Sequence, residues 1–123
     1  MKTLLPILAV IALVAPAAAH AQAPGGLQPS WQACMDSHLE PQQMDCIDTE
    51  YGYQDIRLNR NYRAAMARLA PPQRAVLRAS EREWLRTHDQ GCTQGMPEMR
   101  ASMTCMLFDI TRRANWLETY RPR

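Results

Sequence analysis

The sequence has almost no lysine and little net charge, and the small net charge argues against partners that are bound through a strong overall field. Its one lysine, Lys2, stands at the amino terminus, so the other basic residues are 13 arginines, which are balanced by 12 aspartates and glutamates. A chain this balanced has no strong overall field to attract nucleic acid or anionic lipid. We therefore expect neither a nucleic-acid partner nor a membrane partner for the mature protein.

The sequence also lacks the residues that most catalytic sites need. Beyond the first 21 residues its histidines are His38 and His88 alone. It contains no Cys-x-x-Cys, Gly-x-Ser-x-Gly or His-Glu-x-x-His motif, which argues against thiol redox chemistry, triad hydrolysis and zinc hydrolysis. Paired carboxylates such as Glu50 and Asp55 stand among arginines at solvated helix spacings. We expect a protein that is not an enzyme and that needs no cofactor or metal.

No apolar run in the chain is long enough to cross a bilayer. The run Leu4–Val14 spans about 11 residues, whereas a transmembrane helix needs ~20. Lys2 precedes this run and Ala19-His20-Ala21 follows it, which is typical of a secretory signal peptide at residues 1–21 with cleavage after Ala21. No cysteine stands at the end of the run to carry a lipid. The sequence predicts a soluble protein of 102 residues, exported to the periplasm or secreted.

What the chain does contain is a series of helical patterns, the longest from Met44 to Leu69. Seven apolar or aromatic residues in this stretch recur at steps of three, four or seven, so they share one stripe of a helix. They are Met44, Ile47, Tyr51, Leu58, Tyr62, Ala65 and Leu69. Pro41 suits the first turn, where its missing N–H needs no partner. Because a helix of this length is too long to stand alone, it needs partners along its stripe.

Two further helices are predicted, over about 72–90 and 98–120. The first has a narrow apolar face made of Val76, Leu77, Ser80, Trp84, Leu85 and His88. The second has a buried face made of Met99, Met103, Met106, Leu107, Ile110, Ala114 and Leu117. The turn Ala70-Pro71-Pro72 is very short, so the long helix and the next one should form an antiparallel hairpin. Residues 31–40 are predicted as a short helical turn or loop. The fold class is therefore all-α, a small bundle of about three helices.

Four cysteines in a small exported chain predict two disulfides. Cys34 lies just before the long helix and Cys46 in its first turns, whereas Cys92 and Cys105 flank the break before the last helix. We favour the pairs Cys34–Cys46 and Cys92–Cys105, each of which closes a loop of about a dozen residues and contributes roughly 3 kcal/mol on the chain-entropy account. The bundle is therefore expected to be stapled by disulfides.

Metal binding is the alternative use of several of these residues. Cys34 with His38, and His88 with Cys92, have a spacing of four that suits a shared zinc ion. Thioethers select Cu(I), and four methionines recur at helical steps: Met96, Met99, Met103 and Met106. In an oxidising compartment we favour disulfides over zinc, and we favour core packing over copper binding for the methionine stripe. A periplasmic copper-binding protein remains the alternative function.

Trp84 and the charged residues around it are the remaining concentration of interest. We interpret Trp84 as an aromatic anchor between the long helix and the one that follows, with its charged neighbours solvated or paired along the helix. The alternative is a contact surface for a partner. Its candidate binding residues are Trp84, Arg82 and Asp89, together with Arg100 between the last two cysteines.

Several residues and short motifs stand along the chain in a specific order and spacing: Cys34, Cys46-Ile47, Glu50-Tyr51, Asp55-x-x-Leu58-Asn59-x-x-Tyr62, Leu77, Ser80-x-Arg82-x-Trp84, Asp89-x-x-Cys92, Cys105 and Thr111. Through these features the chain resembles the lysozyme inhibitor LprI-like family of exported bacterial proteins, from about Cys34 to Leu117. The chain departs from the family pattern at Glu81, where glutamine is usual, and at His88 and Ala114, where arginine is usual.

The resemblance implies a compact, disulfide-bonded helical domain, which we place at residues 34–121. The proline- and glycine-rich composition before it predicts a flexible linker at residues 22–33. It also implies a non-catalytic binding protein of the cell envelope, whose partner is a lysozyme or another cell-wall hydrolase. A lysozyme cleft carries two carboxylates, so an arginine is a suitable group to plug it. The segment between Cys92 and Cys105, with Arg100, and the turn at Ala70–Arg74 are the two candidate contact surfaces. An envelope structural or assembly factor is a further alternative.

Overall fold

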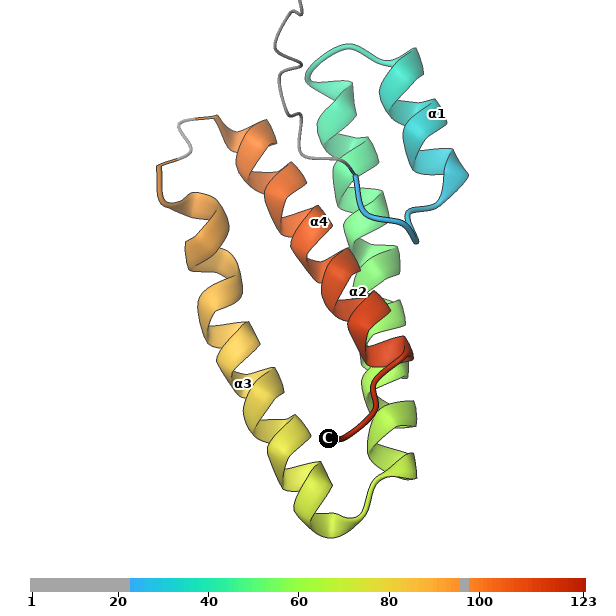
Figure 1. Ribbon diagram of the computed structural model, residues 1–123. Helices are drawn as coiled ribbons and strands as arrows, with labels where there is room; N and C mark the ends of the chain where they lie inside the picture. Colours follow the sequence, from blue (N-terminus) through green and yellow to red (C-terminus); the bar gives the residue numbers. More distant parts are fainter. Residues whose placement is uncertain (1–22, 96–97) are drawn as a thin grey trace, which may run out of the picture.

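The structure is a computed structural model that describes residues 23–95 and 98–123, and the predicted signal peptide lies outside them. These residues form four helices and no strand: α1 (Pro29–Ser37), α2 (Gln42–Arg68), α3 (Pro71–Thr93) and α4 (Met99–Glu118). Figure 1 shows the short α1 beside the start of α2, with α3 and α4 completing the bundle. The predicted all-α class is confirmed, whereas the predicted number of three helices is one too low.

The additional helix is α1, in a segment for which we expected a short helical turn or a loop. Its apolar face is short, and no side chain caps its amino terminus, so the local sequence carries a weak helix signal. Burial of Trp31 anchors this helix, because its side chain is only 8% exposed and packs with Ile47 and Leu107. Tertiary packing therefore stabilises a helix that would be marginal by itself. Residues 29–33, which we assigned to a linker, form its first turns, and the domain limits themselves stay a prediction.

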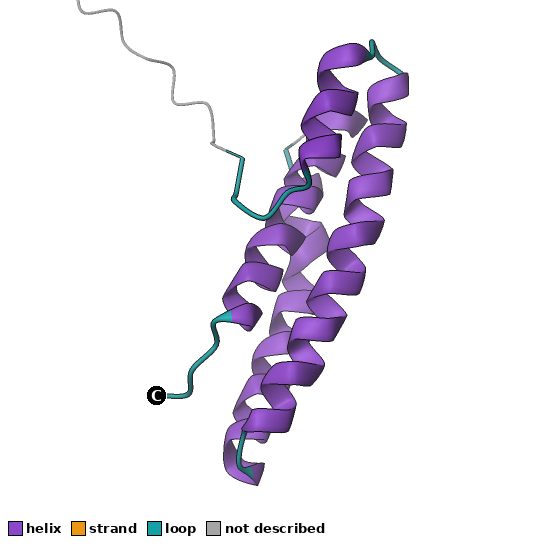
Figure 2. Cartoon of the chain, turned by 90° about the vertical axis from the view of Figure 1, so that its right-hand side faces the viewer, coloured by secondary structure: helices purple, strands orange, loops and turns teal. Residues whose placement is uncertain are grey.

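The stripe predicted on the long helix faces the interior of the protein. All seven of its residues are buried or half-buried: Met44, Ile47, Tyr51, Leu58, Tyr62, Ala65 and Leu69. The helix that covers this stripe is α4, and the pair α2–α4 is the most extensive helix pair in the molecule. The turned view in Figure 2 shows these helices running side by side along the length of the molecule.

Helices α2 and α3 form the predicted antiparallel hairpin, joined by Leu69 and Ala70. The helix α3 begins at Pro71, one residue earlier than expected, and the side chain of Gln73 accepts a hydrogen bond from the Ala70 N–H at 3.2 Å. The two arms of the hairpin meet mainly through α4, because α3 packs more extensively on α4 than directly on α2. Helix α4 therefore packs against both arms of the hairpin and links them.

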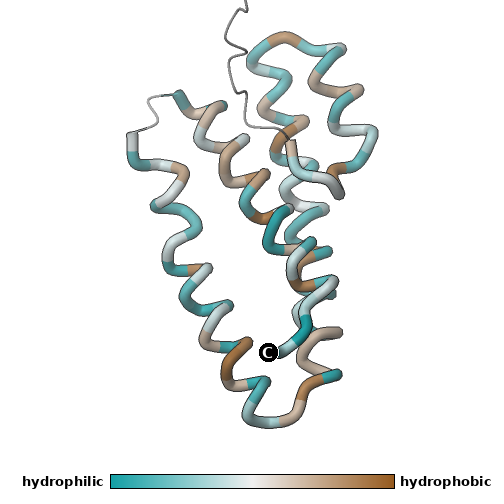
Figure 3. The backbone as a smooth tube through the Cα atoms, viewed as in Figure 1, coloured by the Kyte–Doolittle hydropathy of each residue, from teal (hydrophilic) through white to brown (hydrophobic). Residues whose placement is uncertain are grey.

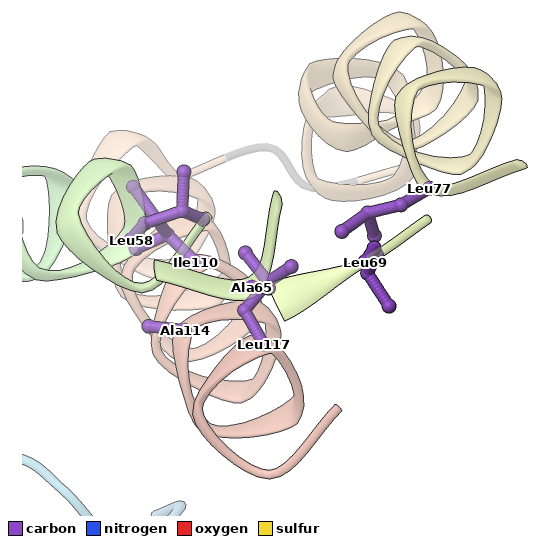
Figure 4. Packing of buried hydrophobic residues seen from close by; sticks show 7 residues of the cluster. All are labelled: Leu58, Ala65, Leu69, Leu77, Ile110, Ala114 and Leu117. Atoms are coloured by element: carbon purple, nitrogen blue, oxygen red, sulfur yellow. The ribbon is translucent and has the colours of Figure 1, made fainter. Parts of the chain in front are cut away.

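The core consists of two clusters of buried side chains. The larger one lies where α2, α3 and α4 meet (Figure 4), and contains Leu58, Ala65, Leu69, Leu77, Ile110, Ala114 and Leu117. The smaller one gathers Trp31, Cys46, Ile47 and Leu107 around α1. Hydrophilic and hydrophobic stretches alternate along the helices (Figure 3), as expected for amphipathic helices that are covered on one side.

Three residues that we predicted to be buried are exposed: Val76 (64%), Leu85 (58%) and Met99 (73%). The reason on α3 is geometric. Its inward row is Leu77, Glu81, Trp84 and His88, at helical steps of four and three. Val76 and Leu85 stand one position away from this row and therefore point outward. Met99 is the first residue of α4, at its exposed end.

Both predicted disulfides are confirmed. Cys34 pairs with Cys46 and joins α1 to α2, with Cα atoms 5.8 Å apart. Cys92 pairs with Cys105 and joins the end of α3 to α4, with Cα atoms 5.5 Å apart. On the chain-entropy account, loops of this length contribute about 3 kcal/mol each to the free energy of unfolding. One cross-link therefore ties α1 to the first turns of α2, and the other ties the end of α3 to α4.

Residues 25–28 are fastened to α2 and α4 by side-chain hydrogen bonds. The buried carboxylate of Glu50 accepts the Gln28 N–H at 3.0 Å, and the Gln54 side chain donates to the Gly26 carbonyl at 2.8 Å. Asn115 donates to the Gly25 carbonyl at 2.6 Å. Gly26 has a φ of +96°, a conformation that favours glycine. The segment that leads into α1 therefore has a defined path.

Candidate functional site

A chain of hydrogen bonds centred on His88 joins α2, α3 and α4. The His88 Nδ1 atom lies 2.6 Å from Asp109 Oδ2, and the Tyr51 hydroxyl lies 3.0 Å from His88 Nε2. The Trp84 indole N–H donates to the same Asp109 oxygen at 3.0 Å. Because an ionised carboxylate only accepts hydrogen bonds, Nδ1 carries a proton. With a neutral ring, Nε2 then accepts the proton of Tyr51.

The order of carboxylate, imidazole and hydroxyl is that of a hydrolase triad, with a phenol where a serine would stand. Burial, with further contributions from Asp89, Asp55 and Asp109, raises the pKa of Tyr51 above its ordinary value. A raised pKa keeps the phenol protonated, which is the opposite of what activates a nucleophile. The arrangement is therefore suited to holding three helices together rather than to attacking a substrate.

A second buried group of polar side chains lies one turn away, between α3 and α4. The guanidinium of Arg113 contacts the Glu81 carboxylate at 2.8 Å and donates to the Ser80 hydroxyl at 3.0 Å. It also lies 5.7 Å from the ring centre of Trp84 and 4.2 Å from that of Trp116. The pair is almost fully buried on both sides, so each charge depends on the other.

These contacts define the surroundings of Trp84. Its ring centre lies 4.5 Å from that of His88, and the Arg113 guanidinium makes a cation–π contact with the ring. Its indole N–H donates a hydrogen bond to Asp109. These are the contacts of an anchor, and they tie α3 to α4 rather than to α2 as we had expected. Trp84 therefore offers little free ring face to a partner.

A groove of about 300 Å³ lies next to this network, between α2 and α3. Asn59 and Tyr62 of α2 line one side, and Trp84 stands among the lining residues of α3. Arg78 and Arg82 of α3, one helical turn apart, are exposed at the groove. The groove therefore combines aromatic edges with two accessible guanidinium groups and one exposed carboxylate, that of Asp55.

The four candidate binding residues do not form one surface. Trp84 and Arg82 share the groove, and Asp89 is exposed beside it, with a carboxylate oxygen 4.0 Å from His88 Nε2. Arg100 lines a different hollow of about 480 Å³ at the start of α4. There its guanidinium pairs with Glu40 and donates to Gln43 at 3.3 Å.

The residues considered for metal binding have other partners. The sulfurs of Cys34, Cys46 and Cys92 are all in disulfides, and His38 Nδ1 lies 2.8 Å from the Cys34 carbonyl oxygen. The methionines of the stripe have different surroundings, because Met103 packs against the core while Met99 is exposed. Met96 lies outside the described residues.

Sequence reasoning missed Asp109, the acceptor on which the network depends. Nothing in its spacing sets it apart, because its two donors come from another helix 21 and 25 residues away. Glu81 was noted only as a departure from a family pattern, whereas His88 was also placed on the apolar face of its helix and considered as a zinc ligand. Each has a charged partner on α4, which only the packed structure shows.

Comparison with known proteins places these features within a family. The family model described as "Lysozyme inhibitor LprI" matches residues 34–117, which include α2, α3 and nearly all of α4. Searches of curated proteins and of solved structures gave no significant match. In the described part of the chain, no helix has the length and apolar character to span a membrane. Both disulfides and both polar groups lie within the matched range.

Proposed function

This chain belongs to the lysozyme inhibitor LprI family, and we propose on that basis that it binds and blocks a lysozyme-type cell-wall hydrolase. The family match over residues 34–117 is the observation that carries the proposal. The protein acts by occupying the enzyme, without chemistry of its own. Its partner is a hydrolase of the cell wall, which cleaves glycosidic bonds with a pair of carboxylates.

The rigidity of the scaffold supports a function in binding. One disulfide fixes α1 on α2, the other fixes α3 on α4, and the His88 network joins three helices between them. A surface that is already ordered loses little conformational entropy when a partner binds. An inhibitor of this size therefore gains affinity from the same cross-links that stabilise its fold.

The use of the polar groups supports the same proposal. Both ring nitrogens of His88 are engaged, the Tyr51 phenol is held in its protonated form, and Glu81 is neutralised by Arg113. The hydrogen bonds and ion pairs of these groups are made with side chains of neighbouring helices. The exposed residues at the groove are left to contact a partner.

We further propose that the protein works outside the cytoplasm. Two disulfides in a small domain are typical of an oxidising compartment, and the first 21 residues have the pattern of a secretory signal. Amino-terminal sequencing of the protein recovered from a periplasmic extract or culture medium should begin at Gln22. Recovery from the cytoplasm with residues 1–21 still attached would contradict the proposed location.

The test of the proposed function is an inhibition assay with a panel of lysozymes of different structural types. Residues 22–123, with both disulfides formed, should slow at least one of them on cell walls without added metal. Reduced and alkylated protein serves as the control and should lose the effect, because it loses the cross-links. If the oxidised protein slows no member of the panel, the inhibitor function is refuted and only the fold and family remain.

A further inference from the structure

The small net charge of the chain conceals a separation of charge along the molecule. The level of Tyr51, His88 and Asp109, which are joined by hydrogen bonds, divides the helices into two halves. Residues 52–87 and 110–123, the basic half, contain 12 arginines and 4 carboxylates, a formal side-chain charge of +8. Residues 23–50, 89–95 and 98–108, the acidic half, contain 1 arginine and 7 carboxylates, a charge of −6.

The hairpin topology creates this separation from a pattern that looks mixed in the sequence. Arginines fill the second part of α2, the first part of α3 and the end of α4. Because α3 runs antiparallel to its neighbours, these three stretches lie at the same end, near the α2–α3 turn (Figure 1). The expectation of a chain without a strong field was drawn from net charge, and it does not hold for each half taken alone.

Most arginines of the basic half are free to meet a partner. Three carboxylates in this half are neutralised internally, by the pairs Arg57–Glu118, Arg86–Glu83 and Arg113–Glu81. Eight exposed arginines have no carboxylate partner among residues 23–95 and 98–123. They are Arg60, Arg63, Arg68, Arg74, Arg78, Arg82, Arg121 and Arg123.

We propose that the basic half is the surface that binds the hydrolase, with Arg78 and Arg82 at the groove meeting carboxylates of its cleft. This inference rests on the proposed function and specifies its contact surface. The spacing of the two arginines suits such a partner, because a glycosidase cleft presents two carboxylates about 5–10 Å apart. Residues four apart on a helix are separated by about 6 Å, and guanidinium groups bind carboxylates in a two-pronged geometry.

The alternative surface, around Arg100, is less suited to an acidic partner. Arg100 is paired with Glu40 and bonded to Gln43, so its charge is already neutralised. Glu98 lines the same hollow, and the acidic half surrounds it. A carboxylate that approached this end would meet net repulsion. Of the two surfaces that the sequence offered, only the turn at Ala70–Arg74 lies in the basic half, and the groove with Arg78 and Arg82 lies beyond that turn along α3.

The experiment compares two double variants with the same net charge. Arg78→Gln/Arg82→Gln removes two charges from the groove, and Gln90→Glu/Gln94→Glu adds two negative charges to the acidic half at exposed positions. Arg74 is left unchanged, because it donates to the Met66 carbonyl. Binding to a purified lysozyme that wild-type protein inhibits is measured by calorimetry in the absence of cell wall, at low and at physiological salt.

The groove variant should bind about 2- to 25-fold more weakly at low salt, as expected for two exposed charge pairs. The acidic-half variant should bind within about twofold of wild type. The difference should shrink at physiological salt, where the screening length is about 8 Å. Equal loss in both variants would show a net-charge effect and overturn the proposed surface, while inhibition by wild type would still stand.

A second experiment tests whether the arginines bind the enzyme or the cell wall itself. Both variants are sedimented with cell walls without enzyme. If only wall binding, and not calorimetric binding to the enzyme, depends on Arg78 and Arg82, the basic half binds an anionic wall polymer and the proposal is wrong. If wild type neither binds nor inhibits any lysozyme, the proposed function itself fails, which is a separate outcome.

Discussion

Replacing Asp109 with alanine removes the acceptor that the Trp84 indole N–H and the His88 Nδ1–H share. Each donor left without a partner in a buried site costs about 1–3 kcal/mol. The Asp109 side chain is 30% exposed, so water can replace part of what is lost. We therefore expect the free energy of unfolding to fall by about 2–3 kcal/mol in total. For a domain of this size that corresponds to a melting temperature about 10–20 °C lower.

The assay is thermal and denaturant unfolding of residues 22–123, followed by helical circular dichroism with the disulfides intact. Asp48→Ala, which removes an exposed carboxylate from α2, is the control and should change the free energy by less than about 0.5 kcal/mol. Asp109→Ala combined with Trp84→Phe should cost about 1 kcal/mol less than the sum of the single changes, because both break one hydrogen bond. A loss below about 0.5 kcal/mol for Asp109→Ala would refute the structural importance of the network.

Three further predictions concern single contacts. The pKa of Tyr51 is raised in the folded state, so its contribution to stability is fully present below the ordinary tyrosine pKa near 10. That contribution should be lost as the pH rises through the folded pKa. Unfolding curves measured at alkaline pH should show this loss of stability, and Tyr51→Phe should show a smaller loss. Gly26→Ala should cost about 1–3 kcal/mol in denaturant unfolding, since its Cβ would lie 2.7 Å from Asn115 Oδ1, whereas Gly52→Ala, which meets nothing within 4 Å, should gain about 0.5–1 kcal/mol. Met103→Ala should cost about 2 kcal/mol and Met99→Ala less than about 0.5 kcal/mol, and equal effects would contradict their different burial.

The long helix and the disulfides were predictable because their signals are local. The stripe on α2 repeats along almost the whole of a helix of 27 residues, so a chance pattern is improbable, and the inward face of the helix follows directly from the spacing. The cysteines flank helix ends at positions that limit how they pair. Both predictions needed no knowledge of how the helices pack against one another.

The predictions that failed depend on packing instead. On α3, Val76 and Leu85 are as apolar as Leu77, yet only Leu77 lies on the row that meets α4. The inward row contains His88, which the predicted apolar face included, and also Glu81, which that face left out. Both are tolerated there because Arg113 of α4 pairs with the Glu81 carboxylate and Asp109 of α4 accepts a hydrogen bond from His88. Partners on another helix leave no trace in the spacing of either helix.

The candidate site was only partly visible for the same reason. The sequence drew attention to Trp84 and Arg82, which do lie together at the groove. It joined Arg100 to them, although the structure places Arg100 in another hollow with Glu40. The charge separation was hidden because net charge adds residues from opposite ends of the hairpin.

The most direct test of a stoichiometric inhibitor is a titration of a susceptible lysozyme at an enzyme concentration well above the dissociation constant. Residues 22–123 are added in steps, and the initial rate on a soluble oligosaccharide substrate is measured at each step. The rate should fall in a straight line and reach its minimum at one inhibitor per enzyme. A rate that stays constant with added protein, or that falls only on whole cell walls and not on the soluble substrate, would contradict binding to the enzyme.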